Sequence, residues 1–269
     1  MTQTEVCATV AMTLSLVTLE RTSLFAILRL NRPETLNALS NEMFAVLNEH
    51  LDHLESDRNL RAVIITGEGD RAFCAGTDIA ELHDALVGAT ISERGQQLCG
   101  RIESLPVPVI AAINGVAAGG GLELALACHL RVASSSATFS VPEIKLGLIP
   151  GYGGTQRLTR ELGSGPALEM MLTGRSMTSD EALKFGLVSR VVQPSELRSE
   201  ATSLAEEISE LSPLSIRACL QAVIKGLELP LNEGLKLETE LFSSLFETED
   251  AREGTLAFLE KRKPVFKGR

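Results

Sequence analysis

Apolar residues along this chain follow two alternating patterns. Short continuous runs, such as those at 61–66 and 108–113, are typical of strands that are buried on both faces. Longer stretches, such as 40–57, carry apolar residues every three or four positions, which is the period of an amphipathic helix. Strands that alternate with helices predict an α/β core covered by helices.

The same patterns predict where the elements lie. Strands are expected at 14–20, 24–30, 61–66, 108–113, 130–133, 137–141 and 187–192, the first two as a hairpin. Helices are expected at 40–57 with Ser40 as N-cap, near 79–87 and 91–105, and from the capping box between Thr178 and Glu181 to Gly186. Loops are expected at 67–78 and 147–154, and from Pro194 onward only helical signals remain.

These signals divide the chain into a flexible tail at 1–13, an α/β core at 14–194 and a helical region at 195–269. The helical region carries an apolar stripe formed by Leu231, Leu235, Leu241, Phe242, Leu245 and Phe246. The stripe either packs on the same chain or contacts another subunit, because a terminal helical layer has little core of its own to cover.

Composition narrows the class of protein. The 269 residues carry a net charge of −10, which argues against non-specific nucleic-acid binding. The five cysteines are scattered without a CxxC pair, as expected for reduced thiols in a cytosol-like compartment. No apolar run approaches the ~20 residues of a membrane-spanning helix, and the N-terminal segment, with Glu5 and no early Lys or Arg, resembles no secretory signal. We therefore expect a cytoplasmic protein that binds neither nucleic acid nor membrane.

Metal ligands do not gather in the sequence. His50 and His53 would share one helix face, and Cys128 adjoins His129, but no Cys or carboxylate completes a convincing metal set with either pair. Both pairs are interpreted as structural, and no metal is expected.

The centre of the chain, at 114–125, reads NGVAAGGGLELA and is the first candidate for chemistry. Consecutive glycines at a helix start leave backbone N–H groups that can bind negative charge, and an oxyanion hole uses the same geometry for charge that develops during a reaction. Glu123 follows within an apolar stretch, where a carboxylate is costly to bury without a purpose. The structural alternative is a first-turn glutamate that stabilises the helix dipole by ~0.3–1 kcal/mol.

Two further segments are candidates. Glu143 follows Pro142 at a stiff point of the backbone, and it could share acid and base roles with Glu123 around one water. Its structural alternative is a solvent-exposed acid beside Lys145. The segment RAFCAGTD at 71–78 bends at Gly76 and could present a backbone N–H, or it could simply be a loop in which Asp78 caps the following helix.

Several motifs in order resemble those of the enoyl-CoA hydratase (crotonase) family. They are FCAGTDI at 73–79, PVIAAING at 108–115, GGGLE at 119–123, VPE at 141–143 and IPGYGGTQR at 149–157, followed by LTG at 172–174, ALKFGLV at 182–188 and EGTLAFLEKR at 253–262. The similarity runs from about residue 14 to the C-terminus, and so many motifs in the right order are unexpected by chance.

The resemblance implies a fold and an activity. It implies a spiral of repeated ββα units with a C-terminal helical region used in trimerisation, and trimers that commonly pair into hexamers. It also implies a hydratase that adds water across the Cα=Cβ bond of a trans-2-enoyl-CoA to give a 3-hydroxyacyl-CoA. Coenzyme A is then part of the substrate, and no separate cofactor is expected.

Family roles fall on particular residues of this chain. The thioester oxygen would be held by the backbone N–H groups of Thr77 and Gly120. Glu123 would deprotonate the attacking water, and protonated Glu143 would supply the proton to Cα; hydratases of the family keep both acids, whereas isomerases usually keep one. Contacts to coenzyme A would come from the backbone of Ala38 and of Ala75, Gly76, Thr77, Asp78 and Ile79, beside Gly120, with Lys261, Lys263 and Lys267 as candidates for the phosphates.

Three positions depart from the usual family pattern. Thr77 replaces a common alanine, which leaves a backbone donor intact. His129 replaces a frequent aspartate, and Tyr152 lies in a loop of usually smaller residues, where we expect it to narrow the acyl pocket. The alternatives that remain are another enzyme of the family, namely an isomerase, a thioester hydrolase or a branched or aromatic acyl-CoA hydratase, and, in a different class, a non-catalytic or RNA-binding protein on the same scaffold.

Overall fold

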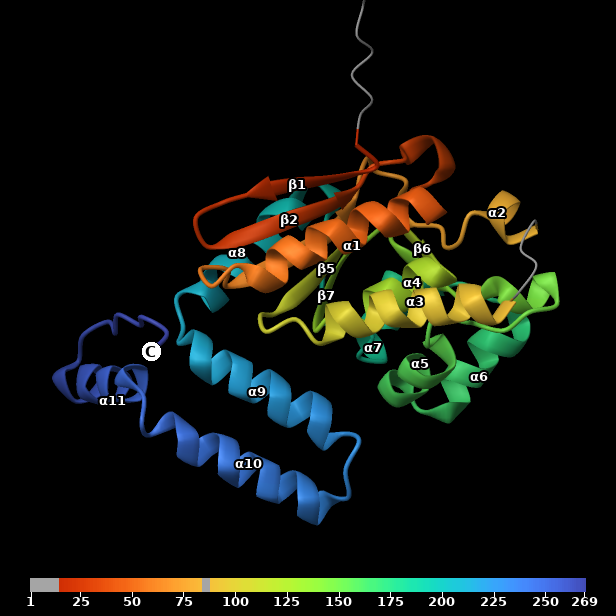
Figure 1. The fold of residues 1–269 in the computed structure, drawn as a ribbon. Coiled ribbons are helices and arrows are strands. Elements are labelled where there is room, and N and C mark those ends of the chain that lie inside the picture. Colours follow the sequence, from red (N-terminus) through yellow and green to blue (C-terminus); the bar gives the residue numbers. More distant parts are fainter. Residues whose placement is uncertain (1–14, 84–87) are drawn as a thin grey trace, which may run out of the picture.

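Two β-sheets and their covering helices form the body of the chain (Figure 1). The computed structural model describes residues 15–83 and 88–269. The tail predicted at 1–13 and the end of the helix predicted at 79–87 lie outside the described residues.

The larger sheet has six strands in the order β1-β2-β3-β5-β7-β10. The β1 and β2 strands pair antiparallel as the predicted hairpin, and the remaining neighbours pair parallel. Its strands are β1 (Val17–Arg21), β2 (Phe25–Leu30), β3 (Ala62–Gly67), β5 (Val109–Ile113), β7 (Leu130–Ser134) and β10 (Arg190–Val192).

The smaller sheet explains the spiral. Its order is β4-β6-β8-β9, with β4, β6 and β8 parallel. Each of three successive strands of the larger sheet, β3, β5 and β7, is followed directly by one strand of the smaller sheet, so every ββα unit adds one strand to each sheet. This is the predicted spiral of ββα units. The smaller sheet is built from β4 (Ala72–Cys74), β6 (Val116–Ala118), β8 (Thr138–Ser140) and β9 (Met177–Thr178).

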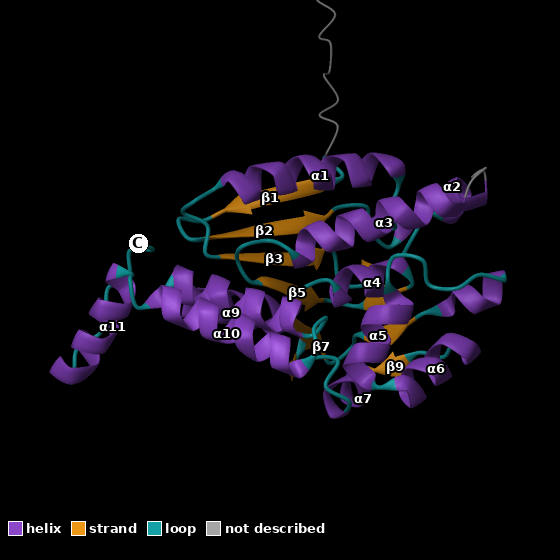
Figure 2. Cartoon of the chain, turned by 60° about the horizontal axis from the view of Figure 1, so that its bottom comes forward, coloured by secondary structure: helices purple, strands orange, loops and turns teal. Residues whose placement is uncertain are grey.

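Helices cover the sheets on more than one side (Figure 2). Ser40 caps α1 by accepting a hydrogen bond from the amide of Met43, as predicted. The Thr178 capping box also forms at the start of α7. The helices are α1 (Asn41–Ser56), α2 (Ile79–His83), α3 (Gly88–Glu103), α4 (Gly120–Leu126), α5 (Gly154–Leu162), α6 (Ser164–Thr173), α7 (Ser179–Lys184), α8 (Leu197–Ser209), α9 (Pro213–Gly226), α10 (Leu231–Leu245) and α11 (Glu249–Glu260), with 3-10 helices η1 (Pro33–Thr35), η2 (Pro142–Leu146) and η3 (Pro194–Glu196).

The core has two parts. The larger cluster lies between the sheets and the helices α1, α3 and α4, and its largest side chains are Phe44, Phe73 and Phe139. The smaller cluster lies where α8 packs on the other face of the six-stranded sheet, through residues such as Leu197 and Leu204. The six-stranded sheet is therefore covered on both faces.

The α9–α10 hairpin and α11 extend away from the sheets (Figures 1 and 2). The two hairpin helices pack along each other, and much of their apolar surface stays open to solvent. Leu231 is 79% exposed, and Phe242 and Phe246 are 61% and 65% exposed while contacting each other edge to face. No helix in the described part of the chain is long and apolar enough to cross a membrane.

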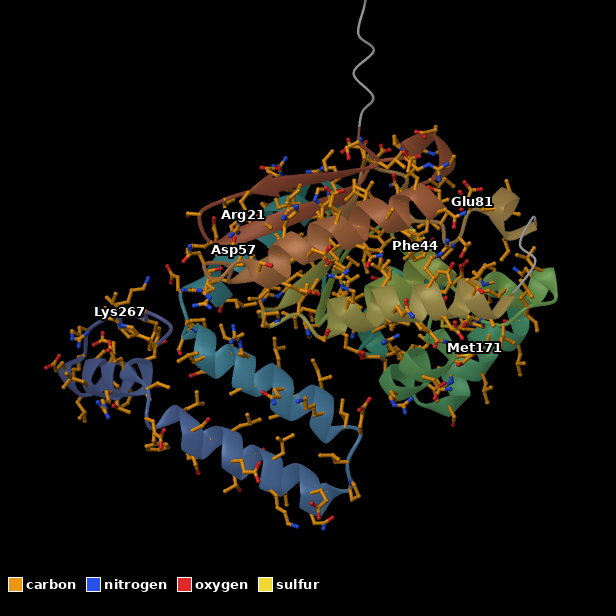
Figure 3. All side chains as sticks on the ribbon, in the orientation of Figure 1. Arg21, Phe44, Asp57, Glu81, Met171 and Lys267 are labelled. Atoms are coloured by element: carbon orange, nitrogen blue, oxygen red, sulfur yellow. The ribbon has the colours of Figure 1, made fainter. Side chains whose placement is uncertain are left out.

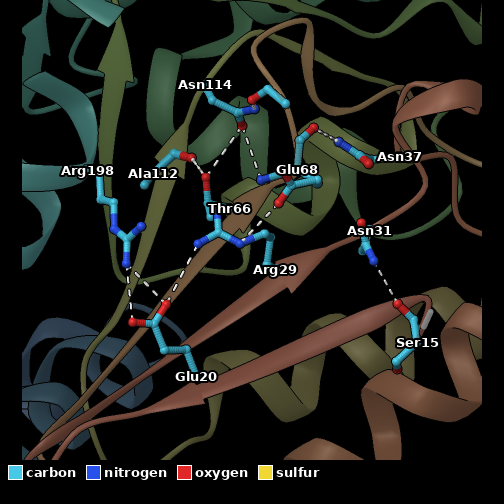
Figure 4. A network of polar contacts seen from close by, with 12 residues as sticks. Ser15, Glu20, Arg29, Asn31, Asn37, Thr66, Glu68, Ala112, Asn114 and Arg198 are labelled. Carbon is cyan, nitrogen blue, oxygen red and sulfur yellow. Dashed lines mark hydrogen bonds and ion pairs between the residues drawn. The ribbon is translucent and has the colours of Figure 1, made fainter. Parts of the chain in front are cut away.

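A network of amide side chains fixes the passage from one sheet to the other (Figure 4). Asn114 accepts a hydrogen bond from the Gly67 amide and donates to the carbonyl oxygens of Gly69 and Ala72. Asn37 also donates to the Ala72 carbonyl oxygen, at 2.8 Å. These bonds hold the end of β3 and the start of β4 against the residues that follow β5.

The structure corrects two details of the sequence prediction. The segment at 67–78 was expected to be a loop, but it contains the three-residue strand β4, which is too short to show a period. The strand predicted at 187–192 begins only at Arg190, because the amides of Leu187 and Val188 both donate to the Ala182 carbonyl at the end of α7. Sheet pairing therefore starts later than the apolar run.

Candidate active site

The glycine turn brings two chain segments into close contact. Gly119, with φ at +51°, is the N-cap of α4, and a Cβ at Gly121 would lie 2.1 Å from the carbonyl oxygen of Cys74. Gly76, with φ at +99°, approaches from the other segment, where a Cβ would lie 3.2 Å from the Gly120 nitrogen. Only glycine tolerates these approaches, so the turn joins the end of β4 to the start of α4.

The amides of Thr77 and Gly120 are free to bind a ligand. The neighbours of Thr77 are committed, because the Ala75 amide donates to Leu36 and the Asp78 amide donates to Leu39. Within the described ranges 15–83 and 88–269, neither the Thr77 nor the Gly120 amide has a hydrogen-bond acceptor. Two free donors therefore lie on the two segments that the glycine turn brings into contact. Their use as an oxyanion hole stays a prediction.

Glu123 lies inside the fold and is held by one of its oxygens. Its side chain is on α4 and only 2% of the residue is exposed. Its Oε1 accepts hydrogen bonds from the amides of Tyr152 and Gly154, at 2.7 and 2.6 Å. Its Oε2 has no such bond in the described part of the chain, and the predicted role of Glu123 in proton transfer stays a prediction. Glu123 does lie in the first turn of α4, as in the helix-dipole alternative, but it is buried and held by two amides from another segment.

Glu143 lies opposite, at the start of η2. Its Oε1 would be 2.9 Å from a Cβ at Gly119, so the carboxyl group adjoins the glycine turn. Its Oε2 is buried, and among the described residues it finds no hydrogen-bond partner. An unpaired buried carboxyl oxygen is costly, and here it adjoins a cavity that can admit a polar molecule. The exposed-acid alternative does not describe this residue.

Burial controls the protonation of both acids. It is the largest influence on Glu123, and together with the nearby charge of Glu143 it outweighs the two amide bonds and raises the Glu123 pKa to about 7. Burial also raises the pKa of Glu143. Two carboxyl groups with raised pKa values beside one cavity suit proton transfer near neutral pH.

A cavity of about 740 Å³ opens beside the two acids. Thr77, Glu123 and Glu143 line one part of it, and the rest is lined mainly by residues of α3, of the 148–153 loop and of α5. The Tyr152 ring lies against Gly95 and Gly120, meets the Phe44 ring edge to face at 5.8 Å, and accepts a hydrogen bond from Thr77 Oγ1 at its hydroxyl. Phe44 is labelled on α1 in Figure 3. A narrowing of the acyl pocket by Tyr152 stays a prediction.

The predicted coenzyme A segments lie side by side. Leu39 and Thr77 form an isolated parallel bridge, which brings Ala38 next to the 75–79 segment. Arg32, which the sequence did not single out, connects the two, because it donates to the Ala38 carbonyl at 2.9 Å and pairs with Asp78 at 3.1 Å. Asp78 also accepts from the Ala80 amide, as a helix cap does. Binding of coenzyme A by these segments stays a prediction.

The three basic residues proposed for the phosphates lie elsewhere in this chain. None of Lys261, Lys263 and Lys267 lines the cavity beside the acids. Lys263 pairs with Glu210 at 2.9 Å, and Lys267 lies near the C-terminus, beside α11 (Figure 3). Their predicted role therefore has no support from their position within one chain.

Sequence reasoning missed the residues that hold the loop around Tyr152. Arg157 pairs with Glu103 at 2.9 Å and donates to the Tyr152 carbonyl at 3.1 Å. Arg157 is the last residue of the family motif at 149–157. Its pairing with Glu103, 54 positions away, could not be predicted, because no periodic pattern of the sequence reveals such a contact. His129, predicted to be structural, accepts from the Val109 amide through Nδ1 and contacts the Glu103 carbonyl through Nε2.

Comparison with known proteins identifies the family. The family model described as enoyl-CoA hydratase/isomerase matches residues 20–269, and the chain belongs to this family. A short-chain-enoyl-CoA hydratase of Clostridium acetobutylicum is 41% identical over 254 residues, which cover 94% of this chain and 97% of the relative. An (E)-benzylidenesuccinyl-CoA hydratase of Thauera aromatica is 42% identical, with 94% and 99% covered.

Solved structures agree with the predicted fold. An enoyl-CoA hydratase from Bacillus anthracis superposes with a TM-score of 0.91 at 38% identity, and the match covers 94% of this chain and 100% of that structure. The crotonase-type fold inferred from the sequence motifs is thereby confirmed.

Proposed function

We propose that this chain is an enoyl-CoA hydratase that adds water across the Cα=Cβ bond of a trans-2-enoyl-CoA and forms a 3-hydroxyacyl-CoA. One observation carries the proposal: the buried Glu123 and the half-buried Glu143, whose Oε2 is buried, adjoin one cavity beside the free amides of Thr77 and Gly120. The names of the relatives agree with a hydratase, the activity predicted from the sequence.

The geometry supports a division of labour between the acids. Glu123 is anchored through Oε1, so its Oε2 can take the proton of a water that attacks Cβ. Burial raises the pKa of Glu143 and so favours its protonated form, and we assign to this form the delivery of a proton to Cα. Two carboxyl groups around one water act in this way as base and acid.

Charge on the thioester oxygen is the main electrostatic problem of the reaction. As water adds to Cβ, negative charge moves to this oxygen, and two preorganised amides stabilise it there. One such donor is typically worth ~2.7–4 kcal/mol of transition-state stabilisation. We assign this role to Thr77 and Gly120, whose amides have no other acceptor among the described residues.

The acyl group is the least constrained part of the proposal. Names of relatives include both a short-chain and a benzylidenesuccinyl substrate. Because the Tyr152 ring occupies space beside Gly120 and Thr77, we propose a short, unbranched acyl chain. We also propose a cytoplasmic location, in keeping with the free buried thiols of Cys74, Cys99 and Cys128.

Subunit assembly is a further part of the proposal. The α10 helix packs along α9, while Leu231, Phe242 and the C-cap residue Phe246 stay 79%, 61% and 65% exposed. Apolar surface of this kind is typical of an interface between subunits. We propose a homotrimer or a pair of trimers, formed through α9–α11.

The decisive experiment follows the ultraviolet absorbance of the conjugated thioester after the protein is mixed with crotonyl-CoA, with cinnamoyl-CoA as a bulky comparison. We expect rapid loss of absorbance with wild type, and a loss of activity of at least about 100-fold in Glu123→Gln and in Glu143→Gln. Turnover that survives in either variant would point to a one-acid branch of the family. Turnover of cinnamoyl-CoA alone would contradict the short-chain assignment.

A further inference from the structure

The loop at 151–154 presents its amides to one side and its carbonyls to the other. On the inner side, the amides of Tyr152 and Gly154 both donate to Glu123 Oε1. The carbonyls of Gly151 and Tyr152 are held by other side chains, from α3 and α5, which also line the cavity. The orientation of the catalytic carboxylate therefore depends on residues that do not touch it.

Arg157 is the central residue among those that hold the loop carbonyls. It donates to the Tyr152 carbonyl through Nη1 at 3.1 Å, and through Nε and Nη2 it binds both oxygens of Glu103, at 3.1 and 2.9 Å. The fit is close, because a Cβ at Gly153 would lie 2.3 Å from Arg157 Nη1. Gly153 has φ at +108°, which glycine adopts without strain.

Ser92 and Gln96, one turn apart on α3, hold the preceding peptide. Ser92 Oγ donates to the Gly151 carbonyl at 2.6 Å and Gln96 Nε2 donates to the same oxygen at 3.0 Å. Gln96 also donates to Ser92 Oγ, which fixes both side chains. Side chains of α3 thus bind the Gly151 carbonyl, and a side chain of α5 binds the Tyr152 carbonyl.

We propose that Arg157, supported by Glu103, and Ser92 with Gln96 are positioning residues that hold the 151–154 loop so that its amides fix Glu123 Oε1 and leave Oε2 facing the substrate. This inference rests on the proposed role of Glu123 in hydration. A planar guanidinium suits the task, because its fork can bind a carboxylate with two N–H groups while a third reaches the Tyr152 carbonyl.

Several groups set the charge balance around Glu123. Glu143 faces it from η2, and Arg157 faces it from α5 with its own charge compensated by Glu103. From α3, Cys99 Sγ lies 3.8 Å from the Glu123 backbone oxygen, and its thiol stays protonated because burial raises its pKa. If the loop is released, Glu123 loses two amide donors and the fixed position of the Arg157 charge, and both losses favour the protonated acid.

The test compares Arg157→Gln and Arg157→Lys with wild type by two readings. The first is the pKa of Glu123, titrated by NMR in protein labelled with ¹³C-glutamate and assigned by Glu123→Gln, which needs no substrate. The second is the pH profile of kcat and KM with crotonyl-CoA. We expect both variants to raise the Glu123 pKa, to move the acidic limb of kcat upward by about 1 pH unit, and to lower kcat by up to about 100-fold with KM within about twofold.

Arg157→Lys separates position from charge. Lysine keeps the positive charge but cannot bind Glu103 and the Tyr152 carbonyl as a fork, so a wild-type profile in this variant would overturn the proposal. So would a folded Arg157→Gln protein that loses activity without any change in the Glu123 pKa. Ser92→Ala, a milder change, should move both readings in the same direction by a smaller amount.

The matched control is Arg190→Gln, which removes an arginine from an ion pair with Glu200 outside the cavity. It should leave both readings unchanged. If wild type turned over no enoyl-CoA, the proposed function would fail, yet the NMR titration would still decide whether the loop sets the protonation of Glu123.

Discussion

Glu123 makes the stability of the folded chain depend on pH. Burial raises its pKa from 4.5 to about 7, so between these two values the folded chain retains a proton that the unfolded chain has released. By proton linkage, the contribution of this group to the free energy of unfolding falls as pH rises through that window. A site built for proton transfer is therefore a source of instability at neutral pH.

We expect Glu123→Gln to raise the Tm above that of wild type at pH 8 by a few degrees, and by progressively less toward pH 5. Glutamine carries no charge to bury, and its Oε1 can accept the same two amide bonds. Differential scanning fluorimetry from pH 5 to 8 measures the difference. Glu207→Gln, a change at an exposed position on α8, is the control and should show no such trend. A variant less stable than wild type at pH 8 would contradict this account.

His129 gives the free energy of unfolding a pH dependence of the opposite sign to that from Glu123. Burial lowers its pKa, and its neutral ring accepts the Val109 amide. The unfolded chain binds a proton at this residue below about pH 6.5 while the folded chain resists it, so the stability it contributes is present above 6.5 and is lost as pH falls through the lower folded value.

His129→Ala should therefore destabilise the chain most at pH 8, by roughly 1–3 kcal/mol for the amide left unpaired, and less at pH 5. Chemical denaturation at the two pH values measures this change. A destabilisation that is equal at both would show that protonation of His129 is not coupled to folding.

Individual site residues were predictable to different degrees. Glu123 and the glycine turn were visible because a charge inside an apolar stretch and three consecutive glycines are local signals. Glu143 needed the resemblance, since a Pro-Glu step alone favours an exposed acid. Arg157 and Arg32 were not predicted. Both bind backbone carbonyls and acids that are distant in the sequence and become neighbours only in the folded chain.

At the scale of elements, long patterns were predicted well and short ones were not. The helix α1 and its Ser40 cap followed from periodicity and one capping residue. The strands β4 and β6 have only three residues each, and they pair with each other across more than 40 positions of the sequence. Yet β4 leads directly to Thr77 and β6 leads directly to Gly120, the two predicted amide donors. The elements that were hardest to predict are therefore those closest to the candidate site.

The junction of β4 and α4 should tolerate no added side chain. A Cβ at Gly121 would lie 2.1 Å from the Cys74 carbonyl oxygen, which is backbone and cannot give way. We expect Gly121→Ala to move α4 away from β4, to lower kcat by about 100-fold or more through misplaced amides, and to lower the Tm. Circular dichroism and the crotonyl-CoA assay measure the two effects.

Gly100→Ala provides the control within a longer helix. Nothing lies within 4 Å of a Cβ at Gly100, in the last turn of α3. Alanine there should keep activity and stabilise the chain by about 0.5–1 kcal/mol. If both alanine variants behaved alike, close packing of the glycine turn would not be the cause.

At the scale of the whole molecule, the body and the C-terminal helices differ in how they bury apolar surface. The body encloses two clusters of buried side chains around its sheets. The α10 helix, in contrast, has no fully buried residue, although its apolar stripe was evident in the sequence. The sequence left open whether this stripe packs on the same chain or on another subunit, because periodicity identifies an apolar face and not its partner.

Replacing one aromatic residue of this face should decide between those alternatives. Phe242 is 61% exposed and contacts Phe246 edge to face, so a charge there would cost little in an isolated chain and much in a buried interface. We expect wild type to sediment at three times, or six times, the mass of the 28.8 kDa chain, and Phe242→Asp to sediment at a lower mass with unchanged far-ultraviolet circular dichroism. Ser243→Asp, at an adjacent exposed position, should retain the assembly. A monomeric wild type, or a Phe242→Asp protein that assembles normally, would rule out this face as the interface.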